Sequence, residues 1–242
     1  MEMYDWRQWT RILTIIGTVQ FVILTVLAMV FYPGGTATDS TTVGYSFTQN
    51  FFSDLGGTKT HSGASNTISL VLFFIALTTI GILFIPYLIS LPGIFTNSRL
   101  ARYICYVGST IGVFSAICYI GIAFTPWDIA REGHIFFVKL AFTSIVPVAL
   151  CYTTSMLLEQ GFPKRYAFVF IVFTAILVAY AWLMFNIPVM LSPEGINIQA
   201  VGQKIVVYVM NISFAIQAYG TLRVSQRQIP RSITEATHKT VT

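Results

Sequence analysis

Six long apolar blocks, separated by short polar segments, make up most of the chain. They cover about 10–32, 66–91, 101–125, 133–158, 165–190 and 199–221. Each block can form a helix of about 20 residues, the length that crosses a hydrocarbon layer of about 30 Å. Apolar residues lie on all sides of these blocks and do not alternate with period two, so helices are expected and barrel strands are not. The pattern predicts an all-α, six-span transmembrane helical bundle.

The composition supports a membrane protein and argues against a soluble domain. Of the 242 residues, 55% are hydrophobic and only 10% are charged, whereas a soluble domain carries roughly a quarter of charged residues. We predict one transmembrane domain over residues 1–221 and a flexible cytoplasmic tail over 222–242, because the tail is polar and lacks apolar periodicity. The first block is too long for a signal peptide and lacks a clear cleavage site, so it is interpreted as a retained span.

Basic residues alternate between the two sides of the predicted bundle. The first and third loops hold only Lys59 and Arg131. The N-terminal segment, the second and fourth loops and the tail are richer, with Arg7, Arg11, Arg99, Arg102, Lys164, Arg165, Arg223, Arg227, Arg231 and Lys239. Because such residues concentrate on the cytoplasmic side, both termini are predicted to be cytoplasmic and the odd-numbered loops to face outward. The plasma membrane is the default location in the absence of an organelle signal.

Charge, cysteines and motifs restrict the partners and cofactors. The net charge of +5 fits contact with anionic lipid headgroups, and no basic face interleaved with exposed aromatics points to nucleic acid. Cys105, Cys118 and Cys151 lie inside apolar blocks and are expected to act as small buried hydrophobes. No nucleotide-binding, haem, retinal or zinc-hydrolase pattern is present, so no cofactor is predicted. Membrane lipids are the expected partners, and a homo-oligomer or another membrane partner stays open.

The outward-facing segments collect most of the polar residues that could form a site. The predicted topology places these residues on one side of the membrane, where they could converge in a pocket between helices. The candidate ligand-binding residues are Ser53, Asp54, Asp128, His134, Lys139, Gln203 and Lys204.

Two lysines lie near the outer ends of predicted spans. A charge at the bilayer centre costs about 2.5–3.5 kcal/mol, so Lys139 and Lys204 are candidates for a functional role. Three interpretations stay open: the amino groups reach the interface along flexible stems, they pair with Asp54 or Asp128, or they contact a ligand.

Asp54, Asp128 and His134 are the candidate catalytic residues, as an acid–base set. His134 could act as a general base, or it could simply bond to a nearby carboxylate. Asp54 could cap a short helix or turn, with Gly56 and Gly57 supplying positive φ, or it could face the pocket and pair with His134 or a lysine. Only His61 and His134 could share an outer site, so a three-histidine zinc site is excluded; a mixed His/Asp site stays open, but no metal is predicted.

Three short segments resemble a family of prokaryotic membrane proteins. They are NFFSDLGG, FTPWDIAREGHIFFVKLAF and VGQKIVVYVM, which are similar to motifs of the domain-of-unknown-function 998 family and, more distantly, of the Frag1/DRAM/Sfk1 family. The resemblance implies about six helices and an outward polar cluster of Asp54, Asp128, His134, Gln203 and Lys204. It implies no reaction. Lys204 stands where arginine is common, which weakens a case for bidentate anion binding.

The leading functional hypothesis is therefore a membrane protein whose extracytoplasmic-side polar pocket binds a lipid headgroup or a small polar ligand. The alternatives are an intramembrane lipid hydrolase or transferase that uses Asp and His, a transporter, and an accessory membrane subunit. The sequence leaves open whether the protein is an enzyme.

Overall fold

Six long helices account for most of the structure, a computed structural model that describes residues 5–186 and 192–239, with side chains through residue 226. All six are long and apolar enough to cross a membrane, which confirms the predicted all-α six-span bundle. The expected end of the fifth span, residues 187–190, falls outside the described residues, and α6 begins at Pro193, before the expected start of the sixth span at about 199. The helices are α1 (Trp6–Val30), α2 (Thr67–Ser90), α3 (Arg99–Ala123), α4 (Arg131–Leu158), α5 (Lys164–Asn186) and α6 (Pro193–Lys239), with short 3-10 helices η1 (Phe52–Gly56) and η2 (Leu91–Ile94).

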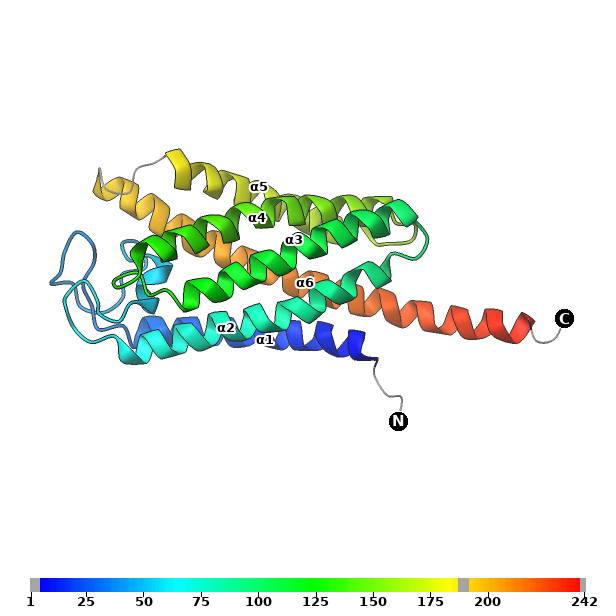
Figure 1. The fold of residues 1–242 in the computed structure, drawn as a ribbon, viewed down its shortest axis with the longest axis horizontal. Helices are drawn as coiled ribbons and strands as arrows, with labels where there is room; N and C mark the ends of the chain where they lie inside the picture. The colour runs from blue at the N-terminus through cyan, green and yellow to red at the C-terminus, as the bar shows by residue number, and fades with distance from the viewer. Residues whose placement is uncertain (1–4, 187–191, 240–242) are drawn as a thin grey trace.

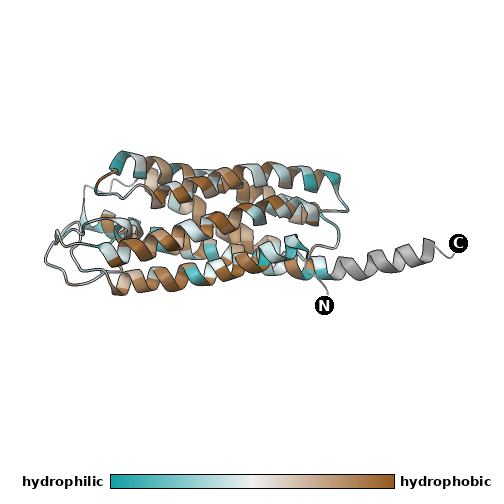
Figure 2. Ribbon diagram, turned by 60° about the horizontal axis from the view of Figure 1, so that its bottom comes forward, coloured by the Kyte–Doolittle hydropathy of each residue, from teal (hydrophilic) through white to brown (hydrophobic). Residues whose placement is uncertain are grey.

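The helices lie side by side along one long axis (Figure 1). α1 packs on α2, α3 packs on α4, and α6 contacts both α1 and α5. Residues 31–66 and 124–130 gather at one end of the bundle, here called the loop end, and both chain termini lie toward the other, the terminal end. Hydrophobic residues dominate the helices between the two ends (Figure 2), as expected of a bundle surrounded by lipid.

The last helix differs from the prediction. Residues from 222 onward were expected to form a flexible tail, but α6 continues as helix to Lys239. At and just beyond the expected end of the span, α6 carries hydroxyl groups: Thr221 is buried, and Ser225 accepts a hydrogen bond of 2.8 Å from the guanidinium of Arg11 on α1, a residue that is only 2% exposed. A hydrophobicity pattern cannot register a polar contact of this kind, so the prediction ended the helix too early.

The terminal end is held together by one buried carboxylate. Glu159, just after α4, accepts hydrogen bonds of 2.9–3.1 Å from the backbone N–H groups of Thr96, Asn97 and Ser98, at the start of α3. These three residues directly precede α3, and a negative charge beside the N-terminus of a helix is stabilising. Both oxygens of this carboxylate are therefore engaged by backbone amides.

Candidate functional site

The long first loop folds back onto the loop end and inserts η1 between the helices. Phe52 and Leu55 of η1 are buried. The Phe52 ring lies 6.0 Å from the ring of Phe21 on α1, 5.6 Å from Phe73 on α2 and 5.6 Å from Tyr208 on α6. The loop thus closes the loop end of the bundle with aromatic side chains that would otherwise meet water.

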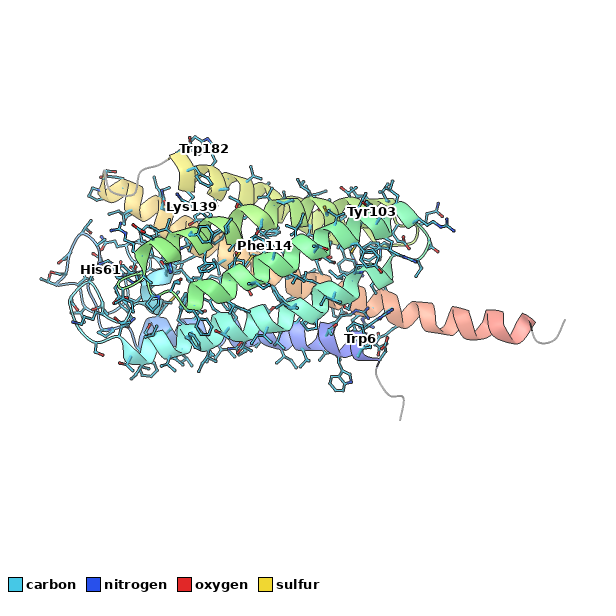
Figure 3. The ribbon with its side chains drawn as sticks, in the orientation of Figure 1. Trp6, His61, Tyr103, Phe114, Lys139 and Trp182 are labelled. Carbon is cyan, nitrogen blue, oxygen red and sulfur yellow. The ribbon has the colours of Figure 1, made fainter. Side chains whose placement is uncertain are left out.

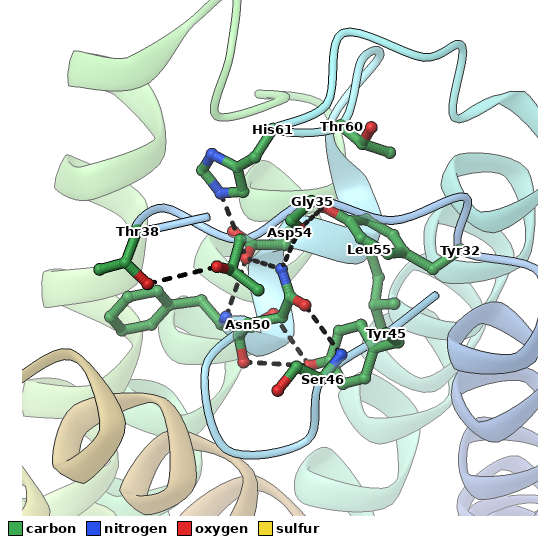
Figure 4. Close-up of polar contacts among 12 residues, drawn as sticks. Tyr32, Gly35, Thr38, Tyr45, Ser46, Asn50, Asp54, Leu55, Thr60 and His61 are labelled. Atoms are coloured by element: carbon green, nitrogen blue, oxygen red, sulfur yellow. Dashed lines mark hydrogen bonds and ion pairs between the residues drawn. The ribbon is translucent and has the colours of Figure 1, made fainter. Parts of the chain in front are cut away.

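Asp54 holds this loop in shape through a buried hydrogen-bond network (Figure 4). Its carboxylate is 4% exposed. One oxygen accepts from the Asn50 side-chain amide at 3.0 Å and from the Phe51 backbone N–H at 2.9 Å, and it lies 3.4 Å from His61 Nε2. Asn50 also donates to the Gly35 carbonyl at 2.9 Å. Asp54 therefore does stabilise the start of a short helix. The imidazole ring that lies close to its carboxylate belongs to His61.

Lys204, on α6, holds the first loop against that helix. It is 0% exposed, and its ammonium group donates to the carbonyls of Asn50 and Ala200. The ammonium also lies 5.3 Å from the Tyr45 ring centre and 5.2 Å from that of Phe47. Carbonyl dipoles and aromatic faces replace the water that this charge has lost. Among the described side chains, none forms a direct ion pair with this lysine.

A narrow, mainly apolar cavity of about 40 Å³ lies beneath η1. A single water needs only about 10–15 Å³ of such space, so the cavity can hold a larger group. Gln203, on its wall, accepts a 2.7 Å hydrogen bond from the Phe52 N–H. Its lining comprises Phe21, Phe52, Ser53, Phe73, Leu77, Ile80, Gly81, Phe84, Ala116, Tyr119, Ile122, Val138, Phe142, Gln203, Val207, Met210 and Asn211.

Asn211 places an unpaired polar atom in this apolar lining. The residue is 2% exposed, and its amide group donates to the Val207 carbonyl at 2.9 Å. Its side-chain oxygen has no hydrogen-bond partner among the described residues. Leaving a buried acceptor unpaired costs about 1–3 kcal/mol, so a donor from a bound molecule or water would stabilise this position.

His134 lies on α4, one helical turn before the cavity-lining residue Val138. Val138 and Phe142 line the cavity, and His134 precedes Val138 by four residues, which places it one turn outward on the same face of α4. His134 Nδ1 lies 2.7 Å from the Thr125 carbonyl, which can only accept, so Nδ1 carries the proton. In the neutral ring Nε2 is then the acceptor, and it is buried without a partner among the described residues.

His61 stacks on Trp127 from the third loop, with ring centres 4.7 Å apart.

Gly56 and Gly57, which follow Asp54 in the first loop, were expected to have positive φ, and this expectation was wrong. Gly57 has a φ of −76°, and Gly56 is not among the described glycines with positive φ. Small size is what these positions require. A Cβ on Gly56 would lie 2.7 Å from the Phe73 ring, and one on Gly57 would lie 2.5 Å from the Trp127 indole nitrogen.

Asp128 joins the third loop to the first. Its carboxylate accepts from the Thr58 N–H at 2.9 Å, the Thr58 hydroxyl and the Lys59 N–H at 3.0 Å. Burial works to raise the pKa of Asp128, but these hydrogen bonds outweigh it and hold the pKa below its ordinary value. The charged form is thus favoured in the folded protein, where it clamps the two loops.

Replacing Asp128 with alanine is expected to destabilise the protein by about 1–2 kcal/mol at neutral pH, because several hydrogen bonds to a partly exposed carboxylate are lost. A lowered pKa adds stability that is present above the ordinary pKa and lost as the pH falls below about 4. The stability difference between wild type and Asp128→Ala, measured by thermal unfolding in detergent, should therefore shrink on acidification. Glu132→Ala, at an exposed neighbouring carboxylate, is the control. A difference that stayed constant with pH would contradict this account.

The structure separates the seven candidate ligand-binding residues into two groups. Five lie in η1 or near it: Ser53 and Gln203 line the cavity, Asp54 and Lys204 hold the first loop, and His134 interacts electrostatically with Asp54. Asp128 clamps the loops, and Lys139 points outward on α4, with its ammonium 5.7 Å from the ring centre of Phe185 on α5 (Figure 3). The exposed Lys139 fits the interpretation of an amino group that reaches the interface.

Sequence reasoning missed Asn50, Trp127 and Asn211, which complete the loop end. None of the three is charged, so a search for ionisable groups in apolar surroundings did not select them. Only their positions beside candidate residues could have pointed to two of them. Trp127 directly precedes Asp128, and Asn50 begins the NFFSDLGG segment that contains Asp54.

Within the described part of the chain, no three His, Cys, Asp or Glu side chains come together in a group that could hold a metal ion. Comparisons of the chain with protein-family models, with curated proteins and with solved structures return no match. The geometry of the loop end is therefore the basis for assigning a function, and membership of the domain-of-unknown-function 998 family stays a prediction.

Proposed function

We propose that this integral membrane protein binds a single lipid at the loop end, with the lipid chain in the cavity beneath η1 and the polar head beside His134, Ser53 and Gln203. The observation that carries the proposal is the cavity itself. Its walls are almost entirely hydrocarbon and aromatic, and its few polar side chains, Ser53, Tyr119, Gln203 and Asn211, lie on η1, α3 and α6.

The apolar walls favour a hydrocarbon chain over a small polar ligand. Each buried CH₂ group contributes about 0.8 kcal/mol when it leaves water or another polar setting. A polar solute in the same space would lose its hydrogen bonds to water, and rings such as those of Phe73, Phe84 and Phe142 would return none.

The unpaired atoms indicate which head groups would fit. His134 Nε2 and the Asn211 side-chain oxygen both accept hydrogen bonds and both lack a partner among the described residues. The buried cation, Lys204, already serves two carbonyls. A head group that donates, such as a hydroxyl or an ammonium group, would therefore be preferred over a bare phosphate.

The hydrolase alternative has less support from the contacts. Asp54 bonds to Asn50 and Phe51, Asp128 bonds to the Thr58–Lys59 turn, and His134 bonds to a backbone carbonyl. None of these hydrogen bonds joins the three candidate catalytic residues to one another, as an acid–base set would require. A transporter would need polar groups along a path toward the terminal end, whereas the cavity walls are apolar.

Filling the cavity tests the proposal. Ala116 lines it, and Ala179 is exposed on the lipid-facing side of α5, so Ala116→Phe and Ala179→Phe add the same group inside and outside. With monooleoylglycerol as the probe in native mass spectrometry, Ala116→Phe should weaken binding at least about tenfold, the equivalent of two buried CH₂ groups. Ala179→Phe should bind like wild type. Thermal unfolding checks that both variants are folded, and equal binding by the two would contradict the proposal.

A further inference from the structure

A second pocket, of about 300 Å³, lies at the terminal end where α5 begins and α6 leaves the bundle. It is lined by Pro163, Arg165, Tyr166, Tyr219, Arg223 and Val224. Two guanidinium groups therefore share one small space. Each contacts a tyrosine hydroxyl: Arg165 Nη2 lies 3.3 Å from the Tyr166 hydroxyl oxygen, and Arg223 Nε lies 3.0 Å from that of Tyr219.

No carboxylate compensates these two charges. Among the described side chains, neither Arg165 nor Arg223 forms an ion pair. The acidic residue nearest in sequence to Arg165 within this end, Glu159, is occupied by three backbone N–H groups at the start of α3. Arginine pairs that lack a carboxylate suit phosphate, because each planar guanidinium can donate two parallel hydrogen bonds to phosphate oxygens.

An apolar groove of about 580 Å³ between α1 and α6 begins at the same pocket. Tyr219 lines both the groove and the pocket, and Ile212, Ile216, Tyr219 and Arg223 follow one another along one face of α6 at helical spacing. The groove therefore leads from the arginines toward the middle of the membrane-spanning part. Its α1 side is formed mainly by Ile15, Val19, Val22 and Ile23.

We infer that this second site binds an anionic phospholipid, with the phosphate between Arg165 and Arg223 and one acyl chain along the α1–α6 groove. The charge of the pocket selects the phosphate, and the apolar groove that continues from it selects a lipid over free phosphate. The site is at the opposite end of the bundle from the proposed lipid site and does not depend on it. In the predicted orientation it faces the cytoplasmic leaflet, where anionic lipids attract basic residues.

The phosphate contact is tested with the full chain in detergent and dioleoyl phosphatidylglycerol as the probe, measured by native mass spectrometry. The double variant Arg165→Gln/Arg223→Gln should bind about 30-fold more weakly, since each arginine near an anionic lipid contributes roughly a factor of five. Arg99→Gln removes the same charge from an exposed arginine at the same end of the bundle and should have no effect. Both pocket arginines are exposed as well, so the variants are expected to fold.

The groove is tested by a second variant and a second probe. Ala215→Trp fills the groove and should reduce phosphatidylglycerol binding about tenfold, and glycerol 3-phosphate should fail to displace the lipid at equal concentration. If glycerol 3-phosphate displaced the bound lipid as effectively as added phosphatidylglycerol does, the pocket would be a site for free phosphate, and the lipid assignment would be overturned. Equal binding by Arg165→Gln/Arg223→Gln and Arg99→Gln would overturn the site as a whole.

Discussion

Replacement of Asp54 by alanine is expected to destabilise the protein by about 3–5 kcal/mol, the largest effect of any single loop substitution. The change leaves the Asn50 amide and the Phe51 N–H without their acceptor, and it removes the negative charge nearest to the buried Lys204. Unpaired buried donors and an uncompensated buried charge are both costly. Residues 31–66 should then separate from the helices.

Thermal unfolding in detergent measures the loss of stability, and hydrogen exchange measures the release of the loop. Backbone amides of residues 50–57 should exchange faster in Asp54→Ala, while those in the middle of α3 should keep their protection. Asp39→Ala is the matched control, because Asp39 is an exposed carboxylate in the same loop that bonds to its near neighbours Thr41 and Thr42. Equal effects of the two substitutions would show that the Asp54 network does not hold the loop.

Lys204→Met should destabilise the protein by about 3 kcal/mol, although methionine fits the same space and suits the membrane. The Asn50 carbonyl would lose its donor, and Asp54 would lose a buried positive charge with which it interacts. Lys139→Met removes a lysine from the exposed side of α4 and should change stability by no more than about 0.5 kcal/mol.

A double-mutant cycle adds a stricter test of the same network. Asn50 donates to Asp54 and accepts from Lys204, so the two residues share a partner. The double variant Asp54→Ala/Lys204→Met should therefore lose less stability than the sum of the single variants. Strict additivity in thermal unfolding would indicate that the two residues act independently and that Asn50 does not connect them.

The helical architecture could be predicted from the sequence because it depends on hydrophobicity summed over about 20 residues. Each helix satisfies its own backbone, so the length and apolar character of a block are enough to identify it. The same reasoning failed at the end of α6, where Arg11 and Ser225 form a contact between polar groups from opposite ends of the chain.

The two lysines show why the site could be predicted only in part. Lys139 and Lys204 both lie near the outer end of an apolar span, yet one is exposed beside Phe185 and the other is fully buried against backbone carbonyls. The difference is the face of the helix on which each lies. Helices that are apolar on all sides carry no hydrophobic stripe that would identify this face.

The backbone partners of the loop-end side chains are a second reason why the site could be predicted only in part. Lys204 bonds to the Asn50 carbonyl, Gln203 to the Phe52 N–H, and His134 to the Thr125 carbonyl. Backbone groups are the same at every position, so residue types give no indication of which of them a side chain will meet. The sequence could place the polar residues on one side but could not show that they close an apolar cavity.

Photo-crosslinking of a monoacylglycerol that carries a diazirine near the end of its chain tests the central claim most directly. After illumination of the purified protein, peptide mapping locates the label. If the chain occupies the cavity, the label should appear on cavity-lining residues of α2 and α6 such as Leu77, Phe84 and Met210, and Ala116→Phe should abolish it. The account would be contradicted if the label appeared only on exposed, lipid-facing residues of α2, such as Ile75 and Ile82, and if Ala116→Phe left the labelling unchanged.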